Sequence, residues 1–132
     1  MQGRTYHSLL YHLVFVTKYR SPMLTDEVYV ELRRLFREKE EELDLKIFIA
    51  NGIEDHVHIL LSIPPKHSIA SVVQHLKGYS SHEIPNLFWG TGYGVFSLDK
   101  SDLSGVFEYI KNQREHHGRQ DLDAELQSLR VE

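Results

Sequence analysis

The feature that most constrains this chain is the segment 56–63, which reads His-Val-His-Ile-Leu-Leu-Ser-Ile and is followed by two prolines. Alternate side chains of a β-strand point to opposite faces of its sheet. As a strand, this segment has one wholly apolar face, and its other face carries His56, His58, Leu60 and Ser62. The apolar face has to be covered, so the strand belongs to a sheet with helices packed on that side.

The rest of the chain supplies further strands and helices. Segments with strand character are 6–17, 45–49, 56–63 and 93–98. Segments with helical periodicity run from 26 to about 43, from 68 to about 76, from 101 or 102 to 118, and from 121 to about 129. Thr25 is expected to cap the first helix, and residues 78–91 read as a polar connection. Asn51 and Gly52 predict the turn of an antiparallel hairpin between 45–49 and 56–63.

This order of elements, β-α-β-β-α-β-α, predicts an α+β fold of the ferredoxin-like, split βαβ type. We expect one domain over residues 1–132, with a four-stranded antiparallel sheet and helices on one face. A C-terminal helix that carries Tyr109 completes this architecture. The architecture hosts many activities, so function has to be argued from particular residues.

Composition excludes several classes of protein. The chain contains no cysteine, which rules out disulfide frameworks, thiolate metal sites and cysteine nucleophiles. Any metal ion has to be held by His, Asp, Glu, Asn or Gln. No apolar run approaches the ~20 residues that span a bilayer. The first eight residues lack a signal-peptide core, so we expect a cytoplasmic protein with no membrane partner.

Net charge argues against a protein that coats nucleic acid non-specifically. Fifteen Lys and Arg against nineteen Asp and Glu leave a formal charge of −4, the wrong sign for a global basic footprint. The basic residues are grouped, however, which leaves room for local patches. We interpret Arg33, Arg34 and Arg37 as the solvated face of the first helix, beside the Glu-rich run 38–42.

Two histidines on the predicted strand are the first candidate site. His56 and His58 lie two residues apart, so their imidazoles are side by side on one face, preceded by Asp55. In that position both ring systems are able to bind one divalent cation. The alternative from spacing alone is a pair of partly exposed polar residues on a sheet face.

The third predicted helix offers the second half of a site. Tyr109 and Gln113 are one helical turn apart and share a face displaced from the stripe that contains Ile110. A tyrosine with a pKa near ~10 is a poor nucleophile, but a nearby metal cation makes phenolate attack on a phosphodiester feasible. The alternative is an amphipathic rim. His116 and His117 follow on the same helix and are read as solvated, phosphate-binding or dipole-stabilised residues.

Five segments, in order, carry a family resemblance. They are residues 11–20 (Tyr-His-Leu-Val-Phe-Val-Thr-Lys-Tyr-Arg), 55–60 (Asp-His-Val-His-Ile-Leu), 76–81 (Leu-Lys-Gly-Tyr-Ser-Ser), 92–93 (Gly-Tyr) and 109–113 (Tyr-Ile-Lys-Asn-Gln). Together they resemble the small single-tyrosine HUH transposases of the insertion-sequence 200/605 group. The resemblance covers residues from about 6 to 117.

The resemblance implies a specific chemistry. His56, His58 and Gln113 would hold a divalent metal ion, Mg²⁺ or Mn²⁺, and Tyr109 would be the nucleophile that cleaves single-stranded DNA. Cleavage would leave a 5′-phosphotyrosine and a free 3′-hydroxyl, and a 3′-hydroxyl of another strand would reverse the reaction at a new junction. Such an exchange needs no nucleotide cofactor, in agreement with the lack of a phosphate-binding glycine loop.

The resemblance also implies partners. The DNA would carry hairpins, and a local groove with aromatic residues would bind it. Our candidates for that groove are Lys18, Tyr19, Arg20, Lys77, Tyr79, Trp89 and Lys111. For Tyr79 and Trp89 ordinary packing is the alternative. A homodimer with composite active sites is expected, and Leu60 with Val14 and Phe48 would otherwise leave apolar surface on the sheet face away from the helices.

The chain departs from the family pattern in two places. The stretch 85–91 is shorter than its counterparts, and residues 98–101 before the tyrosine helix contain no glycine hinge. A different class of function stays open: a catalytically silent or domesticated module that binds DNA or RNA hairpins. A histidine-triad phosphohydrolase is excluded because Leu60 stands where a third alternating histidine is required.

Overall fold

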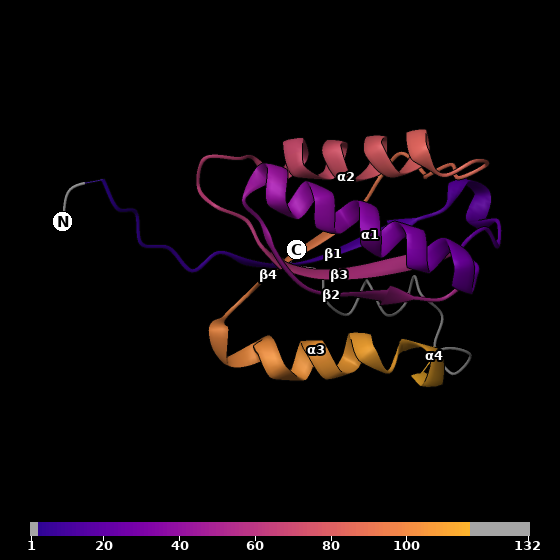
Figure 1. The fold of residues 1–132 in the computed structure, drawn as a ribbon. Helices are drawn as coiled ribbons and strands as arrows, with labels where there is room; N and C mark the ends of the chain where they lie inside the picture. The colour runs from indigo at the N-terminus through magenta and orange to yellow at the C-terminus, as the bar shows by residue number, and fades with distance from the viewer. Residues whose placement is uncertain (1–2, 117–132) are drawn as a thin grey trace.

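The computed structural model describes residues 3–116 and contains one four-stranded sheet. The strands are β1 (Leu10–Val16), β2 (Lys46–Gly52), β3 (His56–Ser62) and β4 (Gly94–Leu98). Their spatial order is β2-β3-β1-β4 and every neighbouring pair is antiparallel (Figure 1). This is the order of a split βαβ unit, so the predicted ferredoxin-like fold and its β2–β3 hairpin are confirmed.

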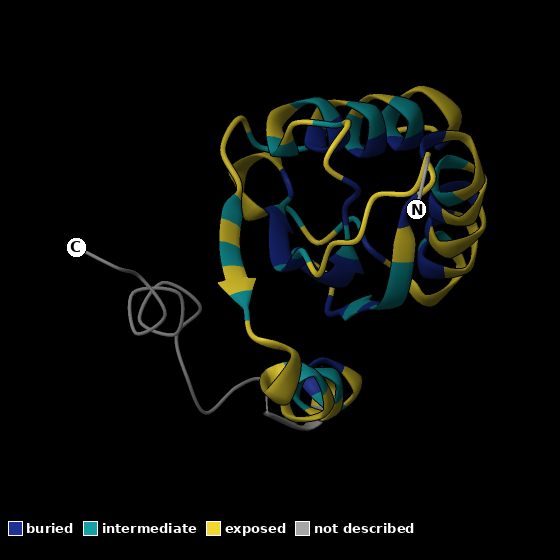
Figure 2. Ribbon diagram, turned by 90° about the vertical axis from the view of Figure 1, so that its left-hand side faces the viewer, coloured by how far each residue is buried: buried dark blue, intermediate teal, exposed yellow. Residues whose placement is uncertain are grey.

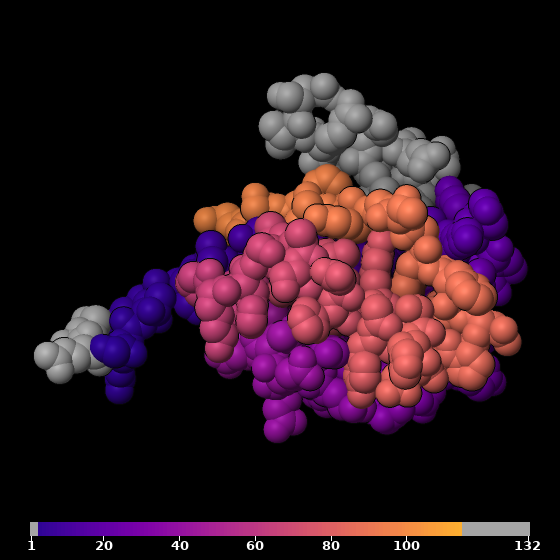
Figure 3. All heavy atoms as spheres, turned by 90° about the horizontal axis from the view of Figure 1, so that it is seen from above, coloured from indigo at the N-terminus to yellow at the C-terminus, as the bar shows by residue number. Residues whose placement is uncertain are grey.

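Helices α1 (Asp26–Leu43) and α2 (Ile69–Glu83) cover one face of the sheet. The predicted apolar face of β3 points into this layer, with Val57, Ile59 and Leu61 all fully buried in the main core. Local sequence sets where each helix begins, since the hydroxyls of Thr25 and Ser68 accept hydrogen bonds from the backbone N–H three residues ahead. Residues 3–8 extend away from this body (Figure 3).

A second, smaller layer covers the opposite face of the sheet. It begins with η2 (Lys100–Asp102), continues as α3 (Leu103–Lys111) and ends in α4 (Gln113–His116). Figure 2 shows α3 across the sheet from the α1 and α2 layer. Among the residues that the structure describes, no helix is long and apolar enough to cross a membrane.

The apolar surface used to argue for a dimer is largely absent. Leu60 and Val14 are both 0% exposed in the single chain, on the sheet face that α3 covers, and Phe48 is half-buried. The argument from exposed apolar area was therefore wrong. A homodimer stays a prediction of the family resemblance alone.

Several boundaries differ from the sequence prediction for reasons of tertiary contact. Asn51 and Gly52 belong to β2 and pair with His58 and Val57, so the hairpin turn falls at residues 53–55. A side chain at Gly52 would collide with the carbonyl of His56, so glycine permits this close pairing.

Helix α2 continues seven residues past the predicted end at 76, to Glu83. The hydroxyl of Ser80 donates to the carbonyl of Leu76 and accepts a hydrogen bond from the indole of Trp89. These bonds satisfy a polar side chain within the helix, so residues 77–83 continue α2 instead of forming a loop. Strand β1 starts at Leu10 rather than residue 6, because its partner strands end there. The predicted C-terminal helix 121–129, His117 and the stop at Gly118 lie outside the described residues.

A candidate active site beneath helix α3

His56 and His58 lie at the start of β3, an inner strand, on the sheet face that α3 covers. Both side chains are 0% exposed and their ring centroids lie 5.0 Å apart. Strand alternation places them side by side as predicted, but the alternative of partly exposed polar residues is wrong. Imidazoles buried this deeply cost free energy unless they are satisfied by protein groups or by a ligand.

Asp55 fixes the orientation of His56. Its Oδ1 lies 2.8 Å from Nδ1 of His56, and its Oδ2 accepts bonds of 3.1 and 3.0 Å from Nε and Nη2 of Arg20. Burial of the Asp55 carboxyl acts to raise its pKa, but the bonds and charges of His56 and Arg20 outweigh it, so the pKa lies below the ordinary value. As a carboxylate, Asp55 accepts Nδ1–H of His56, which leaves the ring lone pair on Nε2.

His12 fixes the orientation of His58 in the way that Asp55 fixes His56. The sequence analysis did not single out His12 as a site residue. Nε2 of His12 lies 2.7 Å from Nδ1 of His58, and His12 is only 3% exposed. Burial lowers the pKa of His12 to about 4, so the ring is neutral near pH 7 and able to accept a hydrogen bond. Alternation already put His12 on the face opposite Leu13, but only the pairing of β1 with β3 brings it to His58.

Tyr109 reaches this cluster from α3. Its ring stands edge-on to His58, with centroids 5.7 Å apart, and its centroid lies 6.3 Å from that of His12. Tyr109 is half-buried, so the phenol belongs to the buried site rather than to an exposed rim. The structure therefore brings together Tyr109, His58 and, one residue further along the face, His56.

Gln113 lies on a separate helix from Tyr109. The predicted single helix breaks at Asn112, and Gln113 begins α4, where it is 2% exposed against β2. Within residues 3–116 no group of three His, Cys, Asp or Glu is arranged to hold a metal ion. Gln113 packs against β2 rather than in a described contact with His56 or His58, and its amide oxygen is of a kind that binds divalent cations.

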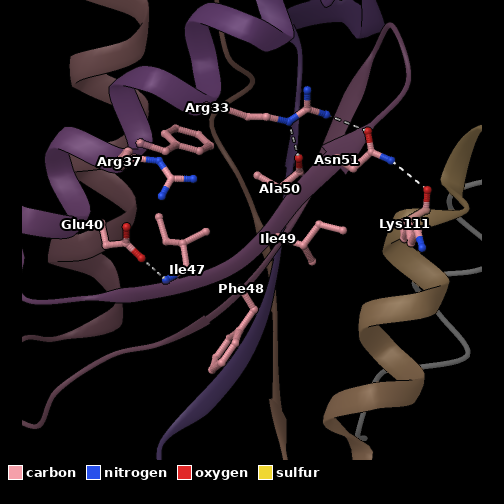
Figure 4. Close-up of a pocket in the computed structure, with 10 residues that line it drawn as sticks. Arg33, Arg37, Glu40, Ile47, Phe48, Ile49, Ala50, Asn51 and Lys111 are labelled. Carbon is pink, nitrogen blue, oxygen red and sulfur yellow. Dashed lines mark hydrogen bonds between the residues drawn. The ribbon is translucent and has the colours of Figure 1, made fainter.

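The end of α3 is tied to the edge of the sheet. Nδ2 of Asn51 donates to the carbonyl oxygens of Ile110 and Lys111, at 3.0 and 3.2 Å. Arg33 of α1 in turn donates from Nη2 to Oδ1 of Asn51 and from Nε to the carbonyl of Ala50, each at 3.0 Å (Figure 4). These bonds use the carbonyls that a helix end leaves without internal partners, and they hold the helix that carries Tyr109.

The predicted DNA-binding residues are divided among several places. Lys18, Lys77 and Trp89 line one open groove of 480 Å³ beside the start of η1 (Lys18–Arg20). Nζ of Lys77 donates to the carbonyls of Gly90 and Gly92, at 2.8 and 2.7 Å. Burial lowers the pKa of Lys77. Trp89 stands edge-on to the buried ring of Phe15, so it has a packing role as well.

The other candidates lie outside that groove. Tyr19 is 88% exposed and has a left-handed backbone (φ 58°), whereas Arg20 is engaged with Asp55. The hydroxyl of Tyr79 donates to Glu38 of α1 at 2.6 Å. This bond, together with the negative charge of Glu38, raises the pKa of the Tyr79 phenol. Lys111 lies at the end of α3, against a different cavity at the edge of β2.

Comparison with known proteins adds a family. Residues 5–113 match the family model described as transposase IS200 like. The ISDra2 transposase TnpA of Deinococcus radiodurans is 29% identical over 86% of this chain and 91% of its own. The transposase for insertion sequence element IS200 of Salmonella typhimurium is 34% identical over 80% of this chain and 76% of its own.

Solved structures agree on the fold. A crystal structure assigned as a transposase from Deinococcus radiodurans R1 is 30% identical, has a TM-score of 0.65, and is matched over 86% of this chain and 97% of that one. A REP-associated tyrosine transposase, solved bound to a REP hairpin, has a TM-score of 0.66 at 19% identity, over 89% of this chain and 74% of that one.

Proposed function

Since this chain belongs to the IS200-like transposase family, we propose that it cleaves and rejoins single-stranded DNA through Tyr109. The observation that carries the proposal is the contact of the Tyr109 ring with the buried histidine cluster, at 5.7 Å from His58. A phenol enclosed beside imidazoles is an arrangement suited to nucleophilic attack on phosphorus. Tyr109 does not belong to the main hydrophobic core, which lies on the other face of the sheet.

We propose that a divalent cation, Mg²⁺ or Mn²⁺, is held by His56, His58 and Gln113. The two histidines fit such an ion, because Nδ1 of each faces a protein group, Asp55 or His12, which leaves Nε2 for a metal. Gln113 is included because the family resemblance gives it the place of the third ligand. When bound, the ion polarises the phosphodiester and neutralises developing negative charge. The work of Asp55 and His12 is to hold the two rings in the tautomer that binds.

The proposed reaction is a balanced exchange of esters. Oη of Tyr109 attacks the phosphorus, a Tyr–O–P bond forms, and the bond from phosphorus to the 3′-oxygen breaks. The proton lost by the phenol is taken up at the departing 3′-oxygen, which leaves a 3′-hydroxyl and a 5′-phosphotyrosine. Attack by the 3′-hydroxyl of another strand reverses these changes, so the number of phosphodiester bonds is conserved and no nucleotide is consumed.

The proposed partners are single-stranded DNA with hairpins and a second copy of the chain. The family supports the DNA, and the same fold binds a hairpin in the REP-associated enzyme. The groove lined by Lys18, Lys77 and Trp89 offers positive charge with an aromatic ring, the combination that binds single strands. Sedimentation at several protein concentrations tests the dimer, and a monomer at micromolar concentration would remove it.

A covalent-complex assay tests the nucleophile. Labelled single strands from the DNA that flanks the gene are mixed with the protein and Mn²⁺ and run on a denaturing gel. We expect a slow-migrating adduct that chelator prevents, that Tyr109→Phe abolishes, and that the control Tyr6→Phe retains. Tyr6 is the matched control because it is 69% exposed and belongs to none of the candidate sites. An adduct formed by Tyr109→Phe would reject the assignment.

The same assay separates the two classes of function. Tight binding of hairpins without an adduct in any metal would favour the silent hairpin-binding module. The metal site is tested separately by Mn²⁺ titration calorimetry, where His58→Ala should weaken binding and the exposed His7→Ala should not. Equal Mn²⁺ affinity in His58→Ala would remove the histidine pair as the metal site.

A further inference from the structure

A second cavity, distinct from the groove at Lys18, lies at the outer edge of the sheet. It has a volume of 380 Å³ and runs along β2, the edge strand, from α1 to the end of α3 (Figure 4). Its size falls within the ~300–1,000 Å³ of ordinary ligand sites. Ile47, Phe48 and Ile49 contribute apolar side chains to its lining, with Phe48 pointing away from α1 and Nζ of Lys46 lying 5.2 Å from the centre of its ring (Figure 4).

The charge of this cavity is positive, in a chain whose net charge is −4. Arg33 and Arg37 come from α1 and Lys111 from α3, whereas Glu40 is the one acid that lines the cavity among the residues described. The carboxylate of Glu40 is already engaged, because its Oε2 accepts the backbone N–H of Ile47 at 2.6 Å. The cavity is therefore lined by three cationic side chains and one carboxylate, and that carboxylate is already hydrogen-bonded to the backbone of β2.

Two of these cations are available to a ligand. Within residues 3–116, neither Arg37 nor Lys111 forms an ion pair, and both side chains are exposed. Arg34, on the same helix, shows the contrast, since Glu31 and Glu38 bind it at 2.8 and 2.7 Å. All three arginines of α1 are exposed, as expected, but Arg33 and Arg37 turn toward β2 whereas Arg34 is paired with acids of its own helix (Figure 4).

The cavity lies one strand away from the candidate active site, because Asn51, which lines it, is the register partner of His58. Arg33 holds Asn51, and Asn51 holds the carbonyls of Ile110 and Lys111 at the end of α3. Lys111 lies two residues beyond Tyr109 on that helix. A single strand with its phosphate at Tyr109 would pass the end of α3, where Lys111 lies on another side of the helix from Tyr109, and then meet Arg37 at the edge of β2.

We propose that this edge groove binds the sugar-phosphate backbone of the single strand on one side of the cleaved phosphate. The proposal rests on the function proposed above and adds a strand path to it. Arg37 and Lys111 contact successive phosphates, and Arg33 shapes the groove. Separated cations along a groove form the kind of site that tracks the backbone of a single strand without regard to sequence.

The test measures how salt affects binding of a fluorescein-labelled single strand from the flanking DNA, long enough to extend from the hairpin past the cleavage site. Fluorescence anisotropy is recorded in a Tyr109→Phe background, so that binding is at equilibrium. The variant is Arg37→Gln with Lys111→Gln. The matched control is Arg34→Gln with Lys66→Gln, which removes the same charge from exposed ion pairs outside the groove.

Loss of two phosphate contacts should make the slope of log K against log salt less steep by ~1.4. The same loss corresponds to binding that is roughly 25-fold weaker at 0.1 M salt. The control should keep the wild-type slope. If the groove variant has the wild-type slope and affinity, the groove proposal fails.

The adduct assay on the parent protein, run in parallel, distinguishes the two proposals. An adduct with no groove effect rejects only the groove. A groove effect with no adduct supports the groove and rejects the reaction at Tyr109. Failure of the parent protein to bind any flanking strand rejects both.

Discussion

Replacing Asn51 with alanine should loosen the helix that carries Tyr109 without unfolding the sheet. The substitution removes two hydrogen bonds to the end of α3, 3.0 Å to Ile110 and 3.2 Å to Lys111. At ~0.5–1.5 kcal/mol for each bond, the docking of α3 loses about 1–3 kcal/mol. Amide hydrogen exchange should therefore speed up roughly 5- to 150-fold in α3, while amides of β1 and β3 keep their protection.

A companion variant separates the two roles of Asn51. Asn51→Asp keeps an oxygen for Arg33, which donates to Oδ1 at 3.0 Å, but it loses the donor to α3. Aspartate should therefore speed exchange in α3 about as much as alanine does. Unchanged exchange in α3 for both variants would refute the idea that Asn51 holds this helix. Equally faster amide exchange in β1 and β3 would show that the substitution destabilises the whole sheet and not the docking of α3 alone.

Three further outcomes follow from the buried groups around the site. Tyr29→Phe removes a buried hydroxyl that lies 2.7 and 2.8 Å from the carbonyls of Ile53 and His56, and should cost about 1–2 kcal/mol of unfolding free energy in urea; an unchanged midpoint would contradict this. Burial holds the pKa of His12 near 4, below the ~6.5 of an unfolded chain. The unfolded state therefore binds more protons as pH falls from about 6.5 to about 4, and the stability of the metal-free protein should decline over that window. His12→Asn should flatten the decline, and an equal slope in both proteins would count against it. Gly52→Ala should lower stability by on the order of 2–3 kcal/mol, because its Cβ meets the carbonyl of His56. The matched change Gly78→Ala meets nothing and should raise thermal stability slightly.

Much of the site was accessible from short-range pattern. The period of two in 56–63 placed His56 and His58 together on one face, and the family resemblance pointed to Tyr109 as their partner. His12 was not accessible in the same way. Its role depends on pairing between strands 46 residues apart in sequence, and nothing in its local pattern distinguishes it from a structural strand residue. The basic edge groove was missed for a similar reason, because only the packing of α1 and α3 on either side of β2 brings Arg37 and Lys111 to one cavity.

Local physics explains what the sequence by itself determined: alternation, helical periodicity and capping residues depend on neighbours a few positions away. They settled the order of elements, the apolar face of β3 and the start of α1 at Asp26. Tertiary structure decided where α3 lies, and with it the full burial of His56, His58 and Leu60. It also decided the break at Asn112 and the inclusion of Gly52 in β2. These outcomes depend on contacts between segments that are distant in the sequence, and the free energy of such contacts cannot be inferred from a local pattern.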